Sequence, residues 1–100
     1  MADFVRACAT GEIEPGTGLT LEVGDKSLAV FNVEGTFHVL DNVCPHRGGP
    51  LGEGELNGCV VTCPWHAWDF DVTTGESVTD DLTVACYEAK IEGDDLLVAV

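Results

Sequence analysis

The chain has 100 residues, with 18 Asp and Glu against only four Lys and Arg, and its formal net charge is −14. This length makes one domain, residues 1–100, and a hydrophobic fraction of 45% argues against disorder. Four scattered cations exclude a run of contacts to nucleic-acid phosphates, and the negative charge disfavours binding to an anionic membrane surface.

In chain order, the predicted elements are short strands separated by turn residues. The segments that alternate apolar and polar residues, or run apolar, are 19–23, 28–33, 36–40, 59–62, 84–91 and 96–100. Glu34-Gly35 predicts a hairpin between the second and third of these, and residues 92–95 predict another between the last two. No window of 11 or more residues shows a helical period. The fold class is therefore predicted to be all-β, an antiparallel sandwich or small barrel.

The centre of the chain has a different composition. Residues 41–70 contain both tryptophans, two of the three histidines, three of the five cysteines and five of the twelve glycines. A single short strand is predicted within this stretch, and it separates two loops. Such a concentration of reactive and turn-forming residues indicates a loop-built site mounted on a β scaffold.

Each of these loops offers one thiol and one imidazole. The first loop carries Cys44 and His46 in the pattern C-P-H, and the second carries Cys63 and His66 in the pattern C-P-W-H. The proline after each cysteine biases that cysteine toward extended backbone and stiffens the turn. The spacing allows both side chains of each loop to point at a shared centre.

Two cysteines and two histidines suit more than one metal centre. A single tetrahedral Zn²⁺ accepts this set, although zinc fingers usually keep the cysteines in one motif and the histidines in the other. A two-iron, two-sulfide cluster suits the mixed motifs, because one iron takes both thiolates and the other both imidazoles. Buried cysteines and solvated histidines without metal are the third alternative.

The two motifs together carry a family resemblance. The runs C-P-H-R-G-G-P-L-G-E-G-E-L and C-P-W-H-A-W-D-F resemble those of the Rieske [2Fe–2S] proteins, and the surrounding strands extend the resemblance over the whole chain. It implies that Cys44 and Cys63 bind one iron and that His46 and His66 bind the other. It also implies a Rieske-like antiparallel β base domain carrying a small, loop-rich cluster-binding subdomain at about residues 41–70.

The resemblance further implies a low reduction potential. High-potential members of the family carry a disulfide between the two loops and two hydroxyl side chains after the second histidine. Here Gly49 and Trp65 stand at the expected disulfide positions, and Trp68 and Phe70 at the hydroxyl positions. The low end of the Rieske range, about −150 to +300 mV, is therefore expected.

The chain most resembles the soluble Rieske ferredoxins of bacterial aromatic-ring dioxygenases. This implies a one-electron carrier, not an enzyme, that accepts electrons from an NAD(P)H-dependent flavin reductase and passes them to a terminal Rieske non-haem iron oxygenase. The alternative is the small Rieske subunit of an NADH-dependent nitrite reductase. No signal peptide or membrane segment is evident, so a cytoplasmic protein without nucleic-acid or membrane partners is expected.

The remaining cysteines and the third histidine receive structural interpretations. Cys8, Cys59 and Cys86 lie in strand-like runs and are predicted to be small apolar core residues. His38 alternates with Phe37 and Val39, which predicts a strand residue on the surface. Because His38 is the one histidine outside the two motifs, a Ser/His/Asp catalytic set is not supported.

Overall fold

A computed structural model of the chain describes residues 4–24, 26–42, 50–64, 69–78 and 83–99. These residues form strands and two short 3-10 turns, and no α-helix lies among them. The strands are β1 (Phe4–Ala9), β2 (Thr17–Val23), β3 (Lys26–Val33), β4 (Thr36–Asp41), β5 (Glu55–Asn57), β6 (Val60–Thr62), β7 (Asp69–Asp71), β8 (Cys86–Tyr87), β9 (Ala89–Glu92) and β10 (Asp95–Ala99). The turns are η1 (Thr10–Glu12) and η2 (Leu51–Glu53). The predicted all-β class is confirmed.

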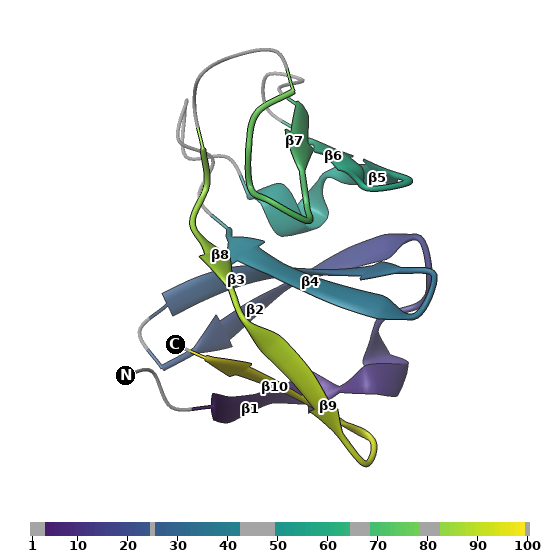
Figure 1. Cartoon of the computed structure of the whole chain (residues 1–100), viewed down its shortest axis with the longest axis vertical. Helices are drawn as coiled ribbons and strands as arrows, with labels where there is room; N and C mark the ends of the chain where they lie inside the picture. Colours follow the sequence, from purple (N-terminus) through teal and green to yellow (C-terminus); the bar gives the residue numbers. More distant parts are fainter. Residues whose placement is uncertain (1–3, 25, 43–49, 65–68, 79–82, 100) are drawn as a thin grey trace.

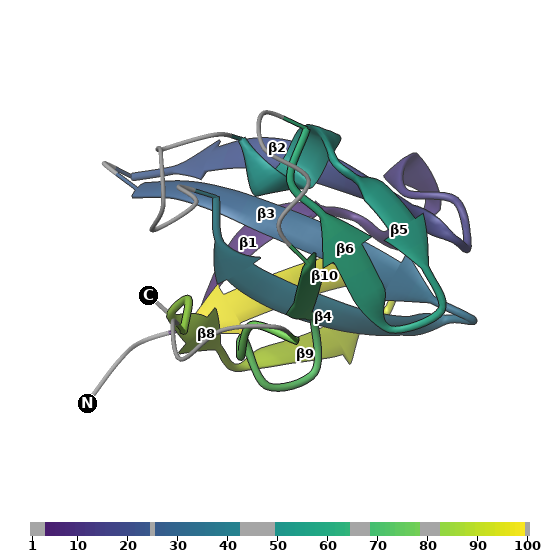
Figure 2. The same cartoon turned by 90° about the horizontal axis from the view of Figure 1, so that it is seen from above.

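Three antiparallel sheets build the domain (Figure 1). A three-stranded sheet has the order β1-β10-β9, and a four-stranded sheet has the order β2-β3-β4-β8. These two make the base. The third sheet, β5-β6-β7, is small and lies over the outer face of the four-stranded sheet, so that from above β5 and β6 cross β3 and β4 (Figure 2).

Strand β3 is buried on both faces, and this explains its nearly continuous apolar run. Leu28 and Val30 belong to the core between the two base sheets, whereas Ala29 and Phe31 belong to the core beneath the small sheet. All four side chains are fully buried. Because successive strand residues point to opposite faces, one strand supplies both cores and fixes the small sheet on the base.

The hairpin predicted at Glu34-Gly35 is present between β3 and β4. Both turn residues have positive φ, 52° at Glu34 and 92° at Gly35. This is the type I′ arrangement, whose twist matches that of the flanking strands. The neighbouring Asn32 side chain accepts a hydrogen bond of 2.7 Å from the Gly35 N–H and donates one of 2.8 Å to the Ile13 carbonyl.

The C-terminal hairpin differs from the sequence prediction in two respects. Its turn is shorter than 92–95, because Glu92 and Asp95 are register partners and Gly93, with φ 63°, occupies the turn. The strand predicted at 84–91 is divided into β8 and β9, because β8 pairs with β4 whereas β9 pairs with β10. The chain changes sheets at this point, and an apolar run does not reveal such a change.

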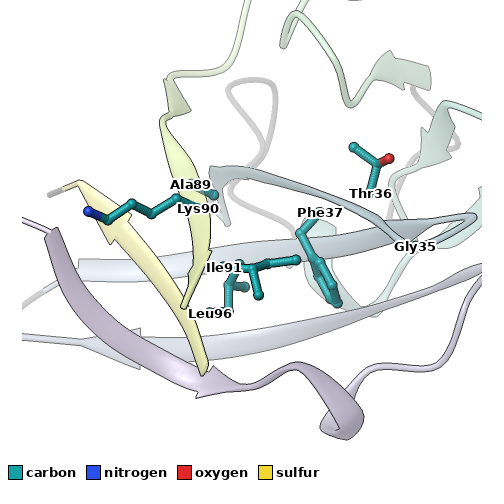
Figure 3. Close-up of a pocket in the computed structure, with 7 residues that line it drawn as sticks. All are labelled: Gly35, Thr36, Phe37, Ala89, Lys90, Ile91 and Leu96. Carbon is teal, nitrogen blue, oxygen red and sulfur yellow. The ribbon is translucent and has the colours of Figure 1, made fainter. Parts of the chain in front are cut away.

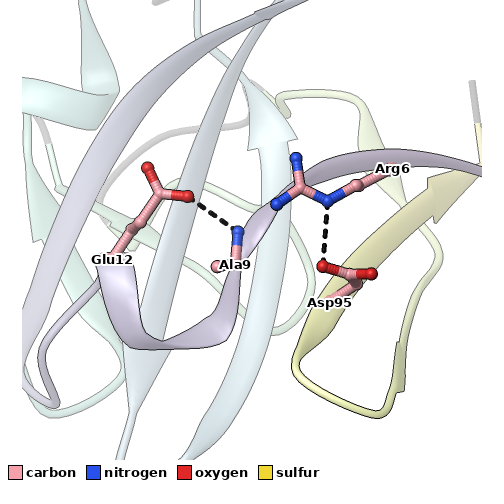
Figure 4. Close-up of polar contacts among 4 residues, drawn as sticks. All are labelled: Arg6, Ala9, Glu12 and Asp95. Carbon is pink, nitrogen blue, oxygen red and sulfur yellow. Dashed lines mark hydrogen bonds and ion pairs between the residues drawn. The ribbon is translucent and has the colours of Figure 1, made fainter.

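Strand β1 was not predicted. Its register against β10 shifts between Arg6 and Cys8, and this bulge breaks the alternation that would mark a strand. Arg6 Nε lies 2.9 Å from the Asp95 carboxylate, and this contact raises the pKa of Arg6 (Figure 4). After β1, Glu12 folds back to accept a 2.8 Å hydrogen bond from the Ala9 N–H.

The prediction that three cysteines fill the core is correct for one of them. Cys8 is 2% exposed and packs between the base sheets. Cys59 and Cys86 are exposed, so their assignment to the core was wrong. Cys59 follows Gly58, whose φ of 62° places it in the turn between β5 and β6, and Cys86 lies in the short strand β8.

Candidate metal centre

The structure describes one of the four predicted ligands. Cys63 directly follows β6, and Pro64 after it is exposed. Cys44, His46 and His66 lie outside the described residues. The site is therefore built from Cys63 and from the residues at which the two motif segments join the described strands.

Cys63 is a buried free thiol. Its exposure is 1%, and it shares the core beneath the small sheet with Leu51, Val61 and Phe70. Val61 and Cys63 are two positions apart in an extended chain, so both side chains point to the core while Thr62 points away. The second motif thus begins at a position that the packing of β6 fixes.

The segment 63–68 is closed at its base by a hydrogen bond between its two flanking residues. Thr62 ends β6, Asp69 begins β7, and the two are register partners. The Thr62 hydroxyl also donates a 2.6 Å hydrogen bond to the Asp69 carboxylate. Backbone pairing and side-chain bonding therefore hold both ends of the second motif together.

The first motif segment leaves β4 at Asn42 and returns at Pro50, just before η2. The Leu51 N–H donates a 2.8 Å hydrogen bond to the Asn42 carbonyl. Leu51 is fully buried in the same core as Cys63. The return of the first segment and the start of the second therefore pack on one apolar floor.

Two glycines make this close packing possible. A Cβ on Gly52 would collide with Thr20, and a Cβ on Gly54 would collide with the carbonyl oxygen of Thr62. The bare backbone around η2 thus lies directly against β2 on one side and β6 on the other. The sequence indicated many glycines here, but not which strands they approach.

The described surroundings of the site are acidic. Residues 50–64 and 69–78 contain no Lys or Arg, and their acidic residues are Glu53, Glu55, Asp69, Asp71 and Glu76. Three described cations make contacts on the base: Arg6 with Asp95, Lys90 with Glu92, and Lys26 over the ring of Tyr87. Arg47 lies outside the described residues.

His38 lies in β4 as predicted, but it is half-buried rather than at the surface. It is on the same face of the strand as Leu40, which packs beneath the small sheet. Its charge helps to lower the pKa of Asp71, although the larger cause is the pair of hydrogen bonds that the carboxylate accepts from the hydroxyl and N–H of Thr73.

A cavity of about 300 Å³ opens between β4 and β9, on the base (Figure 3). It is lined by Gly35, Thr36, Phe37, Ala89, Lys90, Ile91 and Leu96. Lys90 is the one titratable side chain in this lining, and it pairs with Glu92 at 3.1 Å. A second cavity of about 440 Å³ lies beside the turn that contains Cys59. The linings of both cavities exclude Cys63.

Within the described ranges, no three His, Cys, Asp or Glu side chains come together as metal ligands. Nor does any helix in that part of the chain have the length and apolar character needed to cross a bilayer.

Comparison with protein families decides between the alternatives that the sequence left open. Residues 3–89 match the Rieske [2Fe–2S] domain. The chain belongs to the Rieske family. Its cofactor is therefore a Rieske-type [2Fe–2S] cluster, which has two Cys and two His ligands, and neither zinc nor a metal-free domain is retained.

Individual relatives share this Rieske domain over nearly their whole length. The ferredoxin component of a naphthalene 1,2-dioxygenase system from Pseudomonas aeruginosa is 35% identical over 97 residues, which are 95% of this chain and 93% of the relative. A chain from a complex of reduced oxygenase and oxidized ferredoxin in carbazole 1,9a-dioxygenase is 30% identical with a TM-score of 0.87, covering 96% of this chain and 92% of that one.

A Mycobacterium tuberculosis protein described as an NADH-dependent nitrite reductase small subunit is also similar. It is 25% identical with a TM-score of 0.91, over 100% of this chain and 96% of that one. The two Rieske functions weighed from the sequence are thus both represented among structures of this fold, and the identity to the dioxygenase ferredoxins is higher.

The residues present fit a Rieske cluster. The sequence supplies a donor set of two thiols and two imidazoles. Cys63 is unpaired, as a thiolate ligand must be, and it lies in an apolar core that excludes water. Sequence reasoning did not find the residues that close the two segments, namely Asn42, Thr62 and Asp69, because no local pattern marks them.

Proposed function

We propose that this Rieske protein is a low-potential one-electron carrier of an aromatic-ring dioxygenase system. It accepts electrons from an NAD(P)H-dependent flavin reductase and delivers them to a terminal Rieske non-haem iron oxygenase, and it is not itself an enzyme. The observation that carries this proposal is the 35% identity to a dioxygenase ferredoxin component, which covers 95% of one chain and 93% of the other.

We further propose the ligands. Cys44 and Cys63 bind one iron, and His46 and His66 bind the other, within a cluster-binding subdomain at about residues 41–70 of a single domain, 1–100. When bound, the cluster supplies one reversible electron. The burial of Cys63 and the closed base of segment 63–68 support this assignment, because a ligand must be held in place before the metal arrives.

The acidic surroundings of the site support protein partners with basic docking surfaces. Five carboxylates and no cation occur in residues 50–64 and 69–78, and the whole chain carries a net charge of −14. Opposite charge on a reductase or oxygenase would steer association, and salt would screen it. The same charge disfavours nucleic acid and anionic membranes as partners. We place the carrier in the cytoplasm, where NAD(P)H is available.

The ligand assignment is tested by substitution with matched controls. Cys44→Ser, Cys63→Ser, His46→Gln and His66→Gln should each abolish or grossly change the rhombic EPR signal of the reduced protein and lower its iron and acid-labile sulfide. Cys59→Ser and His38→Gln change the same residue types outside the motifs and should retain two irons per chain. Full retention of the signal in any of the four ligand variants would contradict the assignment.

The carrier function is tested with purified partners. A dioxygenase-system reductase with NADH should reduce the protein, and a terminal oxygenase should reoxidise it when mixed with it anaerobically. The rate of reduction should fall about tenfold as the ionic strength rises from about 0.02 to 0.5 M, because screening removes the steering. The midpoint potential should lie near the negative end of the Rieske range, about −150 mV.

The similarity to the nitrite reductase small subunit makes that role the second candidate. A fixed subunit would co-purify in a stable complex with a nitrite reductase large subunit, whereas a carrier binds its partners transiently. Failure of reduction by dioxygenase reductases, together with such a stable complex, would favour the second candidate.

A further inference from the structure

Asn42 makes an unusual number of hydrogen bonds at the point where the chain leaves β4. Its side-chain oxygen accepts bonds from the Gly52 N–H at 2.7 Å and from the Thr20 hydroxyl at 3.2 Å. Its side-chain amide donates to the Ser27 hydroxyl at 3.1 Å. Asn42 thereby connects β2, β3 and the residues that follow the first motif.

The backbone of Asn42 repeats this connection. Its N–H donates to the Ser27 carbonyl at 3.0 Å, and its carbonyl accepts from the Leu51 N–H at 2.8 Å. One residue at the start of segment 43–50 therefore bonds to the two residues that follow the segment, Leu51 and Gly52. Bonds to the four-stranded sheet hold that same residue in place.

The environment requires an amide at this position. Asn42 is 6% exposed, and no described buried polar side-chain atom lacks a hydrogen-bond partner. An apolar side chain would leave the buried Gly52 N–H without its acceptor. The absence of a Cβ at Gly52 lets η2 approach Thr20 closely enough for the Asn42 oxygen to reach both groups.

We propose that Asn42 is a positioning residue that closes the base of the first ligand segment and so sets where Cys44 and His46 stand relative to Cys63. This inference rests on the proposed ligands. The Thr62–Asp69 bond has the corresponding place in the second segment. Asn42 acts through the segment that it closes and not by contact with iron, so its loss affects how firmly the cluster is held.

Asn32 provides a matched control. It is also a buried asparagine, 4% exposed, and its side chain makes two hydrogen bonds, to Ile13 and Gly35. It pairs with Phe37, five residues before Asn42, and is therefore about 16 Å from Asn42 along the strand. Asn32→Ala should thus lose comparable bonding far from the ligand segments.

The experiment compares cluster properties of the holoprotein variants at a temperature where far-ultraviolet circular dichroism shows each to be folded. Release of iron to a chelator should be about tenfold faster in Asn42→Ala than in the wild type, because a buried donor loses its acceptor. The EPR g values of the reduced protein should change as well. Asn32→Ala should leave both measurements at wild-type values, although its melting temperature falls.

A milder variant covers the case in which Asn42→Ala does not fold. Ser27→Ala removes one bond to the Asn42 amide and should accelerate iron release about threefold while remaining folded. Equal iron-release rates and identical g values for the Asn32 and Asn42 variants would overturn the positioning role. A wild-type protein that binds two irons but retains them after Cys44→Ser would instead overturn the ligand proposal.

Discussion

The hydroxyl of Thr62 donates a hydrogen bond of 2.6 Å to the carboxylate of Asp69, and the same two residues are register partners on β6 and β7. Six residues separate them in sequence, and the proposed ligands Cys63 and His66 are among these. The contact therefore closes the second ligand segment independently of the metal. Asn42 closes the first segment in the same manner, so each segment is held at its own base.

Removing the Thr62 hydroxyl should weaken this closure. Thr62→Val keeps the shape of the side chain and its strand propensity but loses the bond to a charged acceptor. We expect a loss of about 1 kcal/mol and a fall in melting temperature of about 4–8 °C for a domain of this size. Thr36→Val changes an exposed threonine on β4 and should shift the melting temperature by less than about 2 °C. Equal shifts would show that the hydroxyl bond is without effect.

Gly54 should tolerate no side chain. A Cβ at this position would collide with the Thr62 carbonyl oxygen and lie 3.0 Å from Val61 Cγ2, and both atoms belong to the short strand β6. We expect Gly54→Ala to cost about 2 kcal/mol through displacement of η2. Gly11→Ala is the control, because a Cβ at Gly11 meets no atom within 4 Å. Chemical denaturation of both variants checks the difference, and equal midpoints would contradict the close approach.

The sequence was most informative where a short segment contains the whole signal. Glu34-Gly35 specifies its own turn, and the two motifs place a thiol and an imidazole a few residues apart. Strand β1 was missed because its bulge breaks the alternation, and β7 because three residues carry no measurable period. Its flanking residue Thr62 shows nothing of its bond to Asp69 in the sequence.

The role of Asn42 was beyond sequence reasoning for a related reason. Its side-chain partners Thr20, Ser27 and Gly52 are 22, 15 and 10 residues away in the chain. Hydrogen bonds at such separations depend on how β2, β3 and η2 pack together, and they leave no local pattern. An asparagine before a loop is equally typical of an ordinary turn.

The stability contributed by Asp71 should depend on pH. Its pKa lies below the ordinary value of 3.8, chiefly because its carboxylate accepts hydrogen bonds from the hydroxyl and N–H of Thr73. A carboxyl group with a lowered folded-state pKa stabilises the fold above its unfolded pKa, and this contribution disappears as the pH falls through the folded pKa. The wild type should therefore exceed Asp71→Asn in stability at pH 6 and lose that advantage below about pH 3 to 4.

Melting curves of the two proteins from pH 6 to pH 3 test this dependence. Thr73→Val removes the larger of the two causes, so it should move the loss of stability to higher pH. An advantage of the wild type that persists unchanged at pH 3 would contradict the assigned cause.

The three cysteines outside the motifs should differ in reactivity toward a thiol reagent. The thiolate is the reacting form, so exposure and pKa together decide the rate. Cys59 and Cys86 are exposed, but partial burial raises the pKa of Cys86, so Cys59 should react first. Cys8 is 2% exposed and burial raises its pKa too, so it should react only on unfolding.

Labelling of the folded holoprotein should therefore consume two thiols in two phases. Cys59→Ser should remove the fast phase and Cys86→Ser the slow one, while Cys8→Ser should change neither. A folded protein in which Cys8 reacts as fast as Cys59 would contradict its place between the base sheets. Because the proposed ligand thiols are held by iron, a third and fourth equivalent should appear only as iron is released, and the rate of that later reaction should rise in Asn42→Ala but not in Asn32→Ala.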